Sequence, residues 1–299
     1  MKRTKFDHSF DAINIFIMAI LLLIMLYPLY YTIIASFSDP YAMLRGEVFL
    51  GIKGFTFASY KEVFKRDSIW TGYLNTSFYT VAGTILALAV TIPCGYALSR
   101  RGIKGKGIIM GLFVFTMYFS GGMIPFYILV KGLGLLNTRG VMIIPAAFSV
   151  YNMIVVRTFY QSTIPEELYE AAMVDGGSQL YILTRIVLPL SSAIIAVISL
   201  YVAVGQWNSY FNALIYIDRS ELYPLQLILR SIIMQSQKLQ ITGNENMSSI
   251  ELQDLMRKQM TAETMKYSLI IISSLPMLIA YPFVQKHFVK GVMIGAIKG

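Results

Sequence analysis

The chain has 299 residues, of which 56% are hydrophobic, and its mean hydropathy is +0.61. Soluble domains contain roughly 45–50% apolar residues, so this composition excludes an ordinary soluble domain and indicates a polytopic membrane protein. The formal charge of +9 would suggest nucleic acid as a partner of a soluble chain. Here the cations lie mainly in short segments beside apolar runs, as topology signals do, and we expect no nucleic-acid partner.

The cysteine and histidine content argues against redox and metal chemistry. The single cysteine, Cys94, lies inside an apolar run, so no intrachain disulfide can form. The two histidines, His8 and His287, are far apart in the sequence. We therefore expect no metal site and no catalytic residues in this chain.

The N-terminus resembles a secretory signal, because Lys2, Arg3 and Lys5 precede an apolar stretch of about 24 residues. That stretch lacks a small-x-small cleavage site, so we interpret it as an uncleaved first span. Crossing the hydrocarbon takes roughly 20 helical residues. The sequence thus predicts an all-α, polytopic protein that forms one transmembrane domain over residues 1–299, with six spans at about 12–35, 73–98, 107–131, 139–158, 187–217 and 264–286.

Charge patterning predicts the orientation of these six spans in the cell (plasma or inner) membrane. An even number of spans places both termini on one side, and the positive-inside rule favours the cytoplasm for both. The predicted extracytoplasmic loops, 36–72 and 218–263, hold a similar number of cations but mix them with acids, and the second could hold a helix near 248–260. The predicted cytoplasmic segments hold Lys2, Arg3, Lys5, Arg100, Arg101, Lys104, Lys106, Lys286, Lys290 and Lys298.

The span cores contain no ionisable residue once their ends are left aside. Proton relays and ion pathways usually carry such residues, so a proton-coupled pump is disfavoured. The cores instead contain glycine, proline, serine and amides, which permit kinks, close packing and a polar lining. For "SGG" at 120–122 and for Pro125 in the third span, we favour a kink and packing role.

The predicted cytoplasmic loop 159–186 leads to the stretch "PEELYEAAMVDGGSQLYILTRIVLP" at 165–189. Pro165 suits a first helical position, the acids after it complement a helix N-terminus, and Gly176-Gly177 can supply a left-handed stop. This predicts a helix of about 11 residues, too short to cross a membrane. A second short helical segment, 178–185, then leads to Leu188-Pro189 at the expected start of the fifth span.

The first of these short helices has a face suited to docking. Leu168, Ala171, Ala172 and Asp175 lie at i, i+3, i+4 and i+7, and the alanines allow close approach to the backbone. From the residues alone, an amphipathic connector lying on the lipid surface is an equally good interpretation.

The spacing of residues in this loop resembles a known motif. Glu170-Ala171-Ala172, three further residues, Gly176, nine further residues and then Ile186-x-Leu188-Pro189 resemble the EAA loop of permease subunits in binding-protein-dependent ATP-binding cassette (ABC) importers. The stretches "SGGMIPFYILVKGLGLLNTRGVMIIP", "WNSYFNALIYI" and "KGVMIGAIKG" are similar to the carbohydrate-importer branch, with its maltose-type and alginate-type permeases.

This resemblance implies a type I ABC importer permease fold in which the loop sits in a cleft of a cytoplasmic ATPase. Closure of the ATPase dimer on ATP would then rotate the spans from inward-facing to outward-facing. At Gly177, where the family more usually has alanine, we expect a looser turn without loss of role. The implied coupling residues are Glu170, Ala171, Ala172, Asp175, Gly176, Ile186, Leu188 and Pro189.

The resemblance also implies the partners. The chain would form half of a pathway for an oligosaccharide, within membrane lipid, together with a second homologous permease, two ATPase subunits and an extracytoplasmic solute-binding protein. The segment "GIKGKG" at 102–107 lacks the Gly-Lys-Ser/Thr ending of a phosphate loop. We expect no cofactor in this chain, with ATP and magnesium bound by the ATPase subunits.

Other function classes remain open at this point. An intramembrane transferase would need an acid, base or metal cluster near a membrane face, and an ion-coupled secondary transporter often has intramembrane charges and inverted repeats. The sequence shows none of these features. An ABC permease for a non-carbohydrate solute is the remaining alternative.

Aromatic and amide side chains in the spans suit a sugar pathway, because flat rings stack on sugars and amides bond to hydroxyl groups. We expect Trp207 and Tyr210 to share one helical face at i and i+3. Helix packing or an interfacial aromatic belt is the alternative for each residue. The candidates are Tyr118, Ser120, Asn152, Gln206, Trp207, Asn208, Tyr210 and Asn212.

Overall fold

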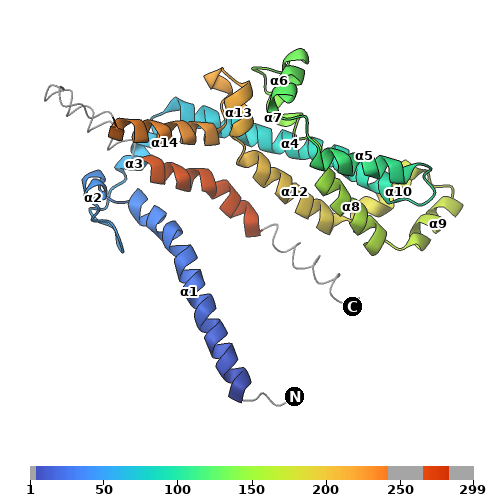
Figure 1. Ribbon diagram of the computed structural model, residues 1–299, viewed down its shortest axis with the longest axis horizontal. Helices are drawn as coiled ribbons and strands as arrows, with labels where there is room; N and C mark the ends of the chain where they lie inside the picture. The colour runs from blue at the N-terminus through green and yellow to red at the C-terminus, as the bar shows by residue number, and fades with distance from the viewer. Residues whose placement is uncertain (1–4, 242–264, 283–299) are drawn as a thin grey trace. The chain divides into compact units, whose positions relative to one another are not determined.

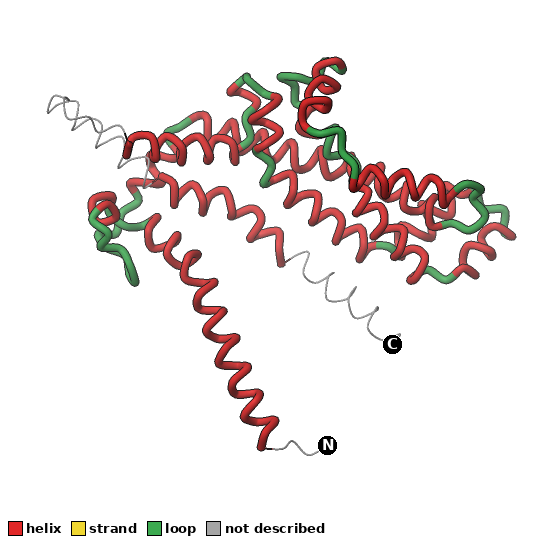
Figure 2. Tube along the Cα trace, viewed as in Figure 1, coloured by secondary structure: helices red, strands yellow, loops and turns green. Residues whose placement is uncertain are grey.

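The computed structural model describes residues 5–241 and 265–282 (Figure 1). Every regular element in these residues is a helix, which confirms the predicted all-α class (Figure 2). The chain divides into two compact units, Met1–Ile69 with Leu229–Ser274 and Trp70–Ile228 with Leu275–Gly299.

The first unit is built on α1 (Lys5–Ser36), whose apolar part, Phe10–Ser36, matches the predicted first span. The chain then forms α2 (Pro40–Leu44) and α3 (Ala58–Phe64), and the segment between them folds back on α1. The Tyr30 hydroxyl holds that segment by donating to the Leu50 carbonyl at 2.7 Å.

The second unit is organised by α4 (Asp67–Ser99), which contains the predicted span 73–98 and starts six residues before it. Near its N-terminal end, side chains of α4 bind the backbone of the segment 221–225. Asn75 Nδ2 donates to the carbonyls of Glu221 and Tyr223 at 2.7 and 3.2 Å. The C-terminal end of α4 contacts a different set of helices, α8 to α10, as Figure 1 shows.

The third predicted span, 107–131, is not one straight helix. It consists of α5 (Lys106–Tyr118) and α6 (Met123–Gly132), which are bent by 111°. Gly122 at the break has φ +84°, which favours glycine, so the kink expected at "SGG" is confirmed.

The fourth predicted span, 139–158, is also interrupted. It consists of α7 (Gly140–Ile143) and α8 (Val150–Thr163), and Pro145 lies between them without a backbone N–H. The Ser149 side chain caps α8 by accepting from the Asn152 N–H. Helix α8 continues to Thr163, about one helical turn past the start of the predicted loop at 159.

The predicted fifth span, 187–217, is broken near both ends. After α9 (Glu166–Val174), α10 (Gln179–Ile182), a π-helical turn (Leu183–Val187) and α11 (Leu188–Leu190) form one helical segment, and α12 (Ser192–Trp207) follows. The bend between the segment and α12 is 83°. Pro189 lies before this bend rather than inside the span, and the Ser191 N–H turns to the Leu188 carbonyl, which ends α11.

Beyond α12 the chain forms α13 (Phe211–Tyr216), a 3₁₀ turn (Ser220–Leu222) and α14 (Leu225–Ile241). Helix α14 was not predicted, and the helix predicted near 248–260 lies outside the described residues. The sixth predicted span is helical over Met265–Pro282. Among the described residues, three helices are long and apolar enough to cross a membrane, or five if each bent pair is one span, where six were predicted.

Candidate functional site

Helix α9 has one buried face and one exposed stripe. Its Tyr169 and Ala172 side chains are 1% and 8% exposed and pack into a core formed with α4, α8 and α12. The predicted docking face is therefore wrong at Ala172, which points into the chain. The other positions of α9 are half-buried or exposed, including Leu168 at 40% and Met173 at 46%. Among them, Glu167, Glu170, Ala171 and Val174 form an exposed stripe at i, i+3, i+4 and i+7.

A glycine pair ends α9 in a Schellman motif. Gly176 has φ +78° and donates its N–H to the Met173 carbonyl at 3.1 Å, and Gly177 donates to the Ala172 carbonyl at 2.8 Å. The predicted left-handed stop at Gly176 is confirmed. The looser turn expected at Gly177 is wrong, because a Cβ there would lie 2.7 Å from the Ala172 carbonyl oxygen.

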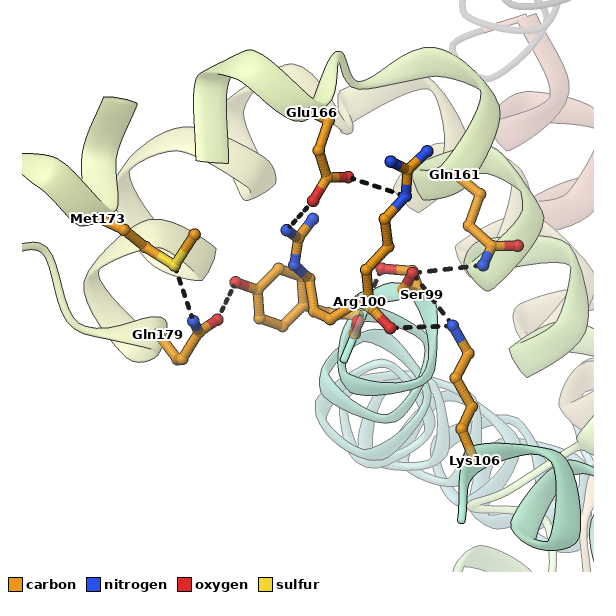
Figure 3. Close-up of polar contacts among 9 residues, drawn as sticks. Ser99, Arg100, Lys106, Gln161, Glu166, Met173 and Gln179 are labelled. Atoms are coloured by element: carbon orange, nitrogen blue, oxygen red, sulfur yellow. Dashed lines mark hydrogen bonds and ion pairs between the residues drawn. The ribbon is translucent and has the colours of Figure 1, made fainter. Parts of the chain in front are cut away.

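The start of α9 is held to the C-terminal end of α4 by a charged pair (Figure 3). Arg100 Nη2 donates to Glu166 Oε1 at 2.6 Å, and the two side chains are 12% and 28% exposed. The Arg100 guanidinium carbon also lies 3.4 Å from the centre of the Tyr169 ring. Burial raises the pKa of the Tyr169 phenol, and the Arg100 charge opposes that shift. Tyr169 is therefore a neutral platform for the guanidinium at physiological pH.

The carbonyl groups at the end of α4 are satisfied by polar side chains from neighbouring elements. Lys106 Nζ donates to the Arg100 carbonyl at 2.9 Å and to the Ser99 carbonyl at 3.3 Å. Arg157 Nε donates to the Leu98 carbonyl at 3.1 Å. Cations near a helix C-terminus also interact favourably with the helix dipole. These bonds fix the backbone from which Arg100 extends.

A second connection joins α4 to the segment after the glycine turn. The Tyr96 hydroxyl donates to Gln179 Oε1 at 2.7 Å, and Ser178 caps α10 by accepting from the Tyr181 N–H. Of the predicted coupling residues in this segment, Ile186 and Leu188 are half-buried against the core, and Pro189 is exposed. The predicted coupling residues are thus divided between the core and the surface.

Two depressions flank α9. One, of about 620 Å³, is lined by Arg100, Glu166, Glu170, Met173 and Gln179 among others. The other, of about 460 Å³, is lined by Ala172, Asp175, Gly176, Gly177, Ser178, Tyr181 and Ile186. The exposed stripe is therefore a ridge between two hollows, a shape that suits insertion into a cleft.

The predicted substrate-path residues do not form one surface. Gln206 and Trp207 are 5% and 4% exposed, and the Trp207 ring packs edge-on against Tyr73 at 5.6 Å. Helix α12 ends at Trp207, where the Ser209 N–H turns to the Gln206 carbonyl and the Asn208 side chain bonds to the Val204 carbonyl. The predicted helical face shared by Trp207 and Tyr210 is therefore wrong.

The other predicted path residues lie at breaks between helices. Tyr118 is 75% exposed at the end of α5, and Ser120 is exposed in the bend that follows. Asn152 lies in the first turn of α8 and is half-buried. Tyr210 is 38% exposed just before α13, and Asn212 is half-buried in its first turn.

Comparisons with known proteins place the chain in a family. No family model matches the sequence. Protein LplC of Bacillus subtilis is 38% identical over 299 residues, which is 100% of this chain and 98% of that protein. The polygalacturonan/rhamnogalacturonan transport system permease protein YtcP of the same organism is 37% identical over 293 residues, covering 98% and 99%.

A solved structure extends this similarity to the fold. The crystal structure of a bacterial ABC transporter involved in the import of the acidic polysaccharide alginate contains a chain with a TM-score of 0.85 and 34% identity, covering 96% of this chain and 99% of that one. The chain belongs to the permease family of ABC carbohydrate importers. The resemblance drawn from the EAA-like spacing is thereby confirmed, and the permease is a membrane protein with the fold of an ABC importer subunit.

Sequence reasoning missed the role of Arg100 in the permease, because Arg100 was interpreted as a topology signal. Its partner Glu166 lies 66 positions later in the chain, and that pairing depends on how α4 and α9 pack. One local signal was present: a cation directly after a helix often binds the terminal carbonyls or a neighbouring acid. Lys106, which bonds to the last carbonyls of α4, follows the same pattern.

Proposed function

We propose that the permease forms half of the translocation pathway of an ABC importer and that α9 is its coupling helix. In this proposal the exposed stripe docks in a cleft of a cytoplasmic ATPase, and the termini are cytoplasmic. A second homologous permease, two ATPase subunits that bind ATP and magnesium, and an extracytoplasmic solute-binding protein complete the transporter. The observation that carries the proposal is the exposure of Val174, 87%, on a helix too short to cross a membrane.

The composition of the stripe favours a protein partner over the lipid surface. Helices that lie on membranes carry lysine and arginine on their polar face and a broad apolar face toward the acyl chains. Helix α9, "EELYEAAMV", has neither lysine nor arginine, and its aromatic residue Tyr169 is buried inside the chain. Glu167 and Glu170 on the stripe would be repelled by anionic lipids. A basic cleft in an ATPase suits these acids, and Ala171 allows close approach.

The proposed substrate is an oligosaccharide, and the relatives favour an acidic one. One relative that matches nearly the whole chain is a permease protein of a polygalacturonan/rhamnogalacturonan transport system, and another belongs to a transporter involved in the import of alginate. The first two contain uronic acids, as alginate does. For contact with the sugar we propose Tyr118, Ser120 and Tyr210, which are exposed at helix breaks where backbone and side chains can reach a ligand.

Uptake into proteoliposomes tests the proposal. The complete transporter, with its binding protein outside and ATP inside, should accumulate a labelled oligogalacturonate unmodified, and a neutral oligosaccharide of equal length more slowly. Collapse of the proton gradient should leave uptake unchanged, whereas removal of ATP should abolish it. Uptake that follows the proton gradient without ATP would instead identify a secondary transporter, and a chemically altered sugar would identify an enzyme.

A further inference from the structure

We propose that Arg100, Glu166 and Tyr169 form a latch that fixes the coupling helix to the C-terminal end of α4. The latch makes α9 and this end of α4 move as one body when the ATPases close. Arg100 is thus a positioning residue for transport, although it lies outside the EAA-like loop. This inference rests on the proposed function for the source of the movement, and its geometry is independent of the substrate.

The latch is stronger than an ordinary surface ion pair. Arg100 is 12% exposed and Glu166 is 28% exposed, so their 2.6 Å bond is charge-assisted and partly shielded from solvent. The stacking of its guanidinium on Tyr169 at 3.4 Å adds a cation–π contact and fixes the angle between the two helices. The neighbouring Arg101 is 83% exposed and lies 4.0 Å from Glu166, which makes it a weak pair and a matched control.

Both sides of the latch are anchored. Arg100 directly follows α4, where the helix C-terminus favours a cation, and Glu166 is in the first turn of α9, where the N-terminus favours an acid. Lys106 holds the Arg100 carbonyl at 2.9 Å. Tyr169 on the α9 side is buried in the core with Tyr96 of α4, at a ring separation of 6.3 Å. The bond therefore joins two fixed backbones rather than two mobile side chains.

The latch connects helices that the peptide chain does not connect directly. The backbone connects α9 to α8 on one side and, through α10 and α11, to α12 on the other, so a movement of α9 can pass to these helices directly. The contact between α9 and α4 depends on side chains. Within that contact, the Arg100–Glu166 bond fixes the distance between the two helices, and the stacking on Tyr169 fixes their angle. Loss of the latch should leave α9 able to dock, while α4 no longer follows its movement.

The first test compares Arg100→Gln with Arg101→Gln in the complete reconstituted transporter. The measured quantity is oligosaccharide transported per ATP hydrolysed on the same vesicles. Arg100→Gln should lower this ratio by about tenfold, a typical strength of coupling between sites. Arg101→Gln should keep it within about twofold, as expected of an exposed pair. A normal ratio in Arg100→Gln at normal complex yield would overturn the proposal.

Charge reversal distinguishes a latch from a residue needed only for folding. Arg100→Glu and Glu166→Arg should each uncouple transport, and the double variant should recover a large part of the ratio. The recovery is expected to be partial because the stacking on Tyr169 is not restored. If the reversed pair assembles normally and recovers nothing, the pairing of Arg100 with Glu166 is not what couples the helices.

Distance measurements test the movement itself. The single cysteine permits a Cys94→Ala background with spin labels introduced by Ala97→Cys on α4 and Leu168→Cys on α9, both exposed positions. The label distance should be the same with and without bound ATP, and Arg100→Gln should broaden its distribution. An ATP-dependent change of equal size in both chains would overturn the latch. Failure of the proposed function would differ, appearing as a lack of ATP-dependent uptake by the unsubstituted transporter.

Discussion

The two ends of α4 are attached to their neighbours by different chemistry. Near the N-terminal end, Asn75, Thr76 and Tyr79 are 3%, 1% and 1% exposed and bond as neutral groups to the backbone of residues 221–225. At the C-terminal end, Arg100 pairs with Glu166, which is 28% exposed. A neutral network with nearly complete burial suits a fixed joint, because each broken bond leaves a dry polar group. The charged pair also holds two helices together, but it is partly exposed, which suits a joint at the surface from which α9 is proposed to dock.

The largest expected effect is a loss of stability at the N-terminal end of α4. Trp207 is 4% exposed and packs against Tyr73 of α4, so Trp207→Ala should leave a cavity costing about 3–5 kcal/mol. The expected result is a strong loss of purified complex, with normal uptake per surviving complex. Normal yield with uptake reduced tenfold or more would instead show that Trp207 binds the sugar, by loss of stacking.

A smaller loss of stability is expected at Asn75, whose side chain serves two backbone carbonyls. Asn75→Ala should destabilise the permease by about 1–3 kcal/mol, because those carbonyls lose their partner in a buried site. The measurement is the thermal unfolding midpoint of the complex in detergent. Ser77→Ala, at a half-buried position two residues along the same helix, is the control and should leave the midpoint unchanged. Equal midpoints for both variants would mean that this end of α4 is not a stable joint.

A still smaller loss of stability is expected at Gly176, which ends α9 beside the C-terminal end of α4. Gly176→Val should cost about 1–2 kcal/mol, because a β-branched residue is strained at φ +78°. Among the residues that the structure describes, and apart from the two chain neighbours, no atom lies within 4 Å of the added Cβ, so this cost arises from the backbone and not from a clash. Uptake should fall several-fold while membrane insertion is normal. Gly176→Asn is the control, since asparagine tolerates this conformation, and it should transport nearly normally. Similar transport by both variants would show that the turn does not position α9.

The sequence predicted the loop that holds α9 better than it predicted the spans. The turn at Gly176 follows from local rules, and the EAA-like spacing identified the family correctly. Three of the six predicted spans are broken in the structure. Hydropathy did not predict these breaks, because it averages over a window and does not show where residues such as Gly122 or Ser191 change the direction of the chain. Helical periodicity also could not predict that Ala172 is buried and Val174 exposed. That difference depends on which side of α9 packs against α4, α8 and α12.

The most direct test of the central claim is protection of the exposed stripe by the ATPases. In the Cys94→Ala background, Val174→Cys is treated with a membrane-impermeant maleimide in inside-out vesicles, with the ATPase subunits bound or stripped. Leu180→Cys, which replaces another exposed aliphatic residue at 69% exposure, is the matched control. We expect rapid labelling at 174 in stripped vesicles and labelling slowed by about tenfold or more with the ATPases bound, as for a residue buried in an interface, and a smaller change at 180. Equal labelling at 174 with and without the ATPases would contradict the docking of α9.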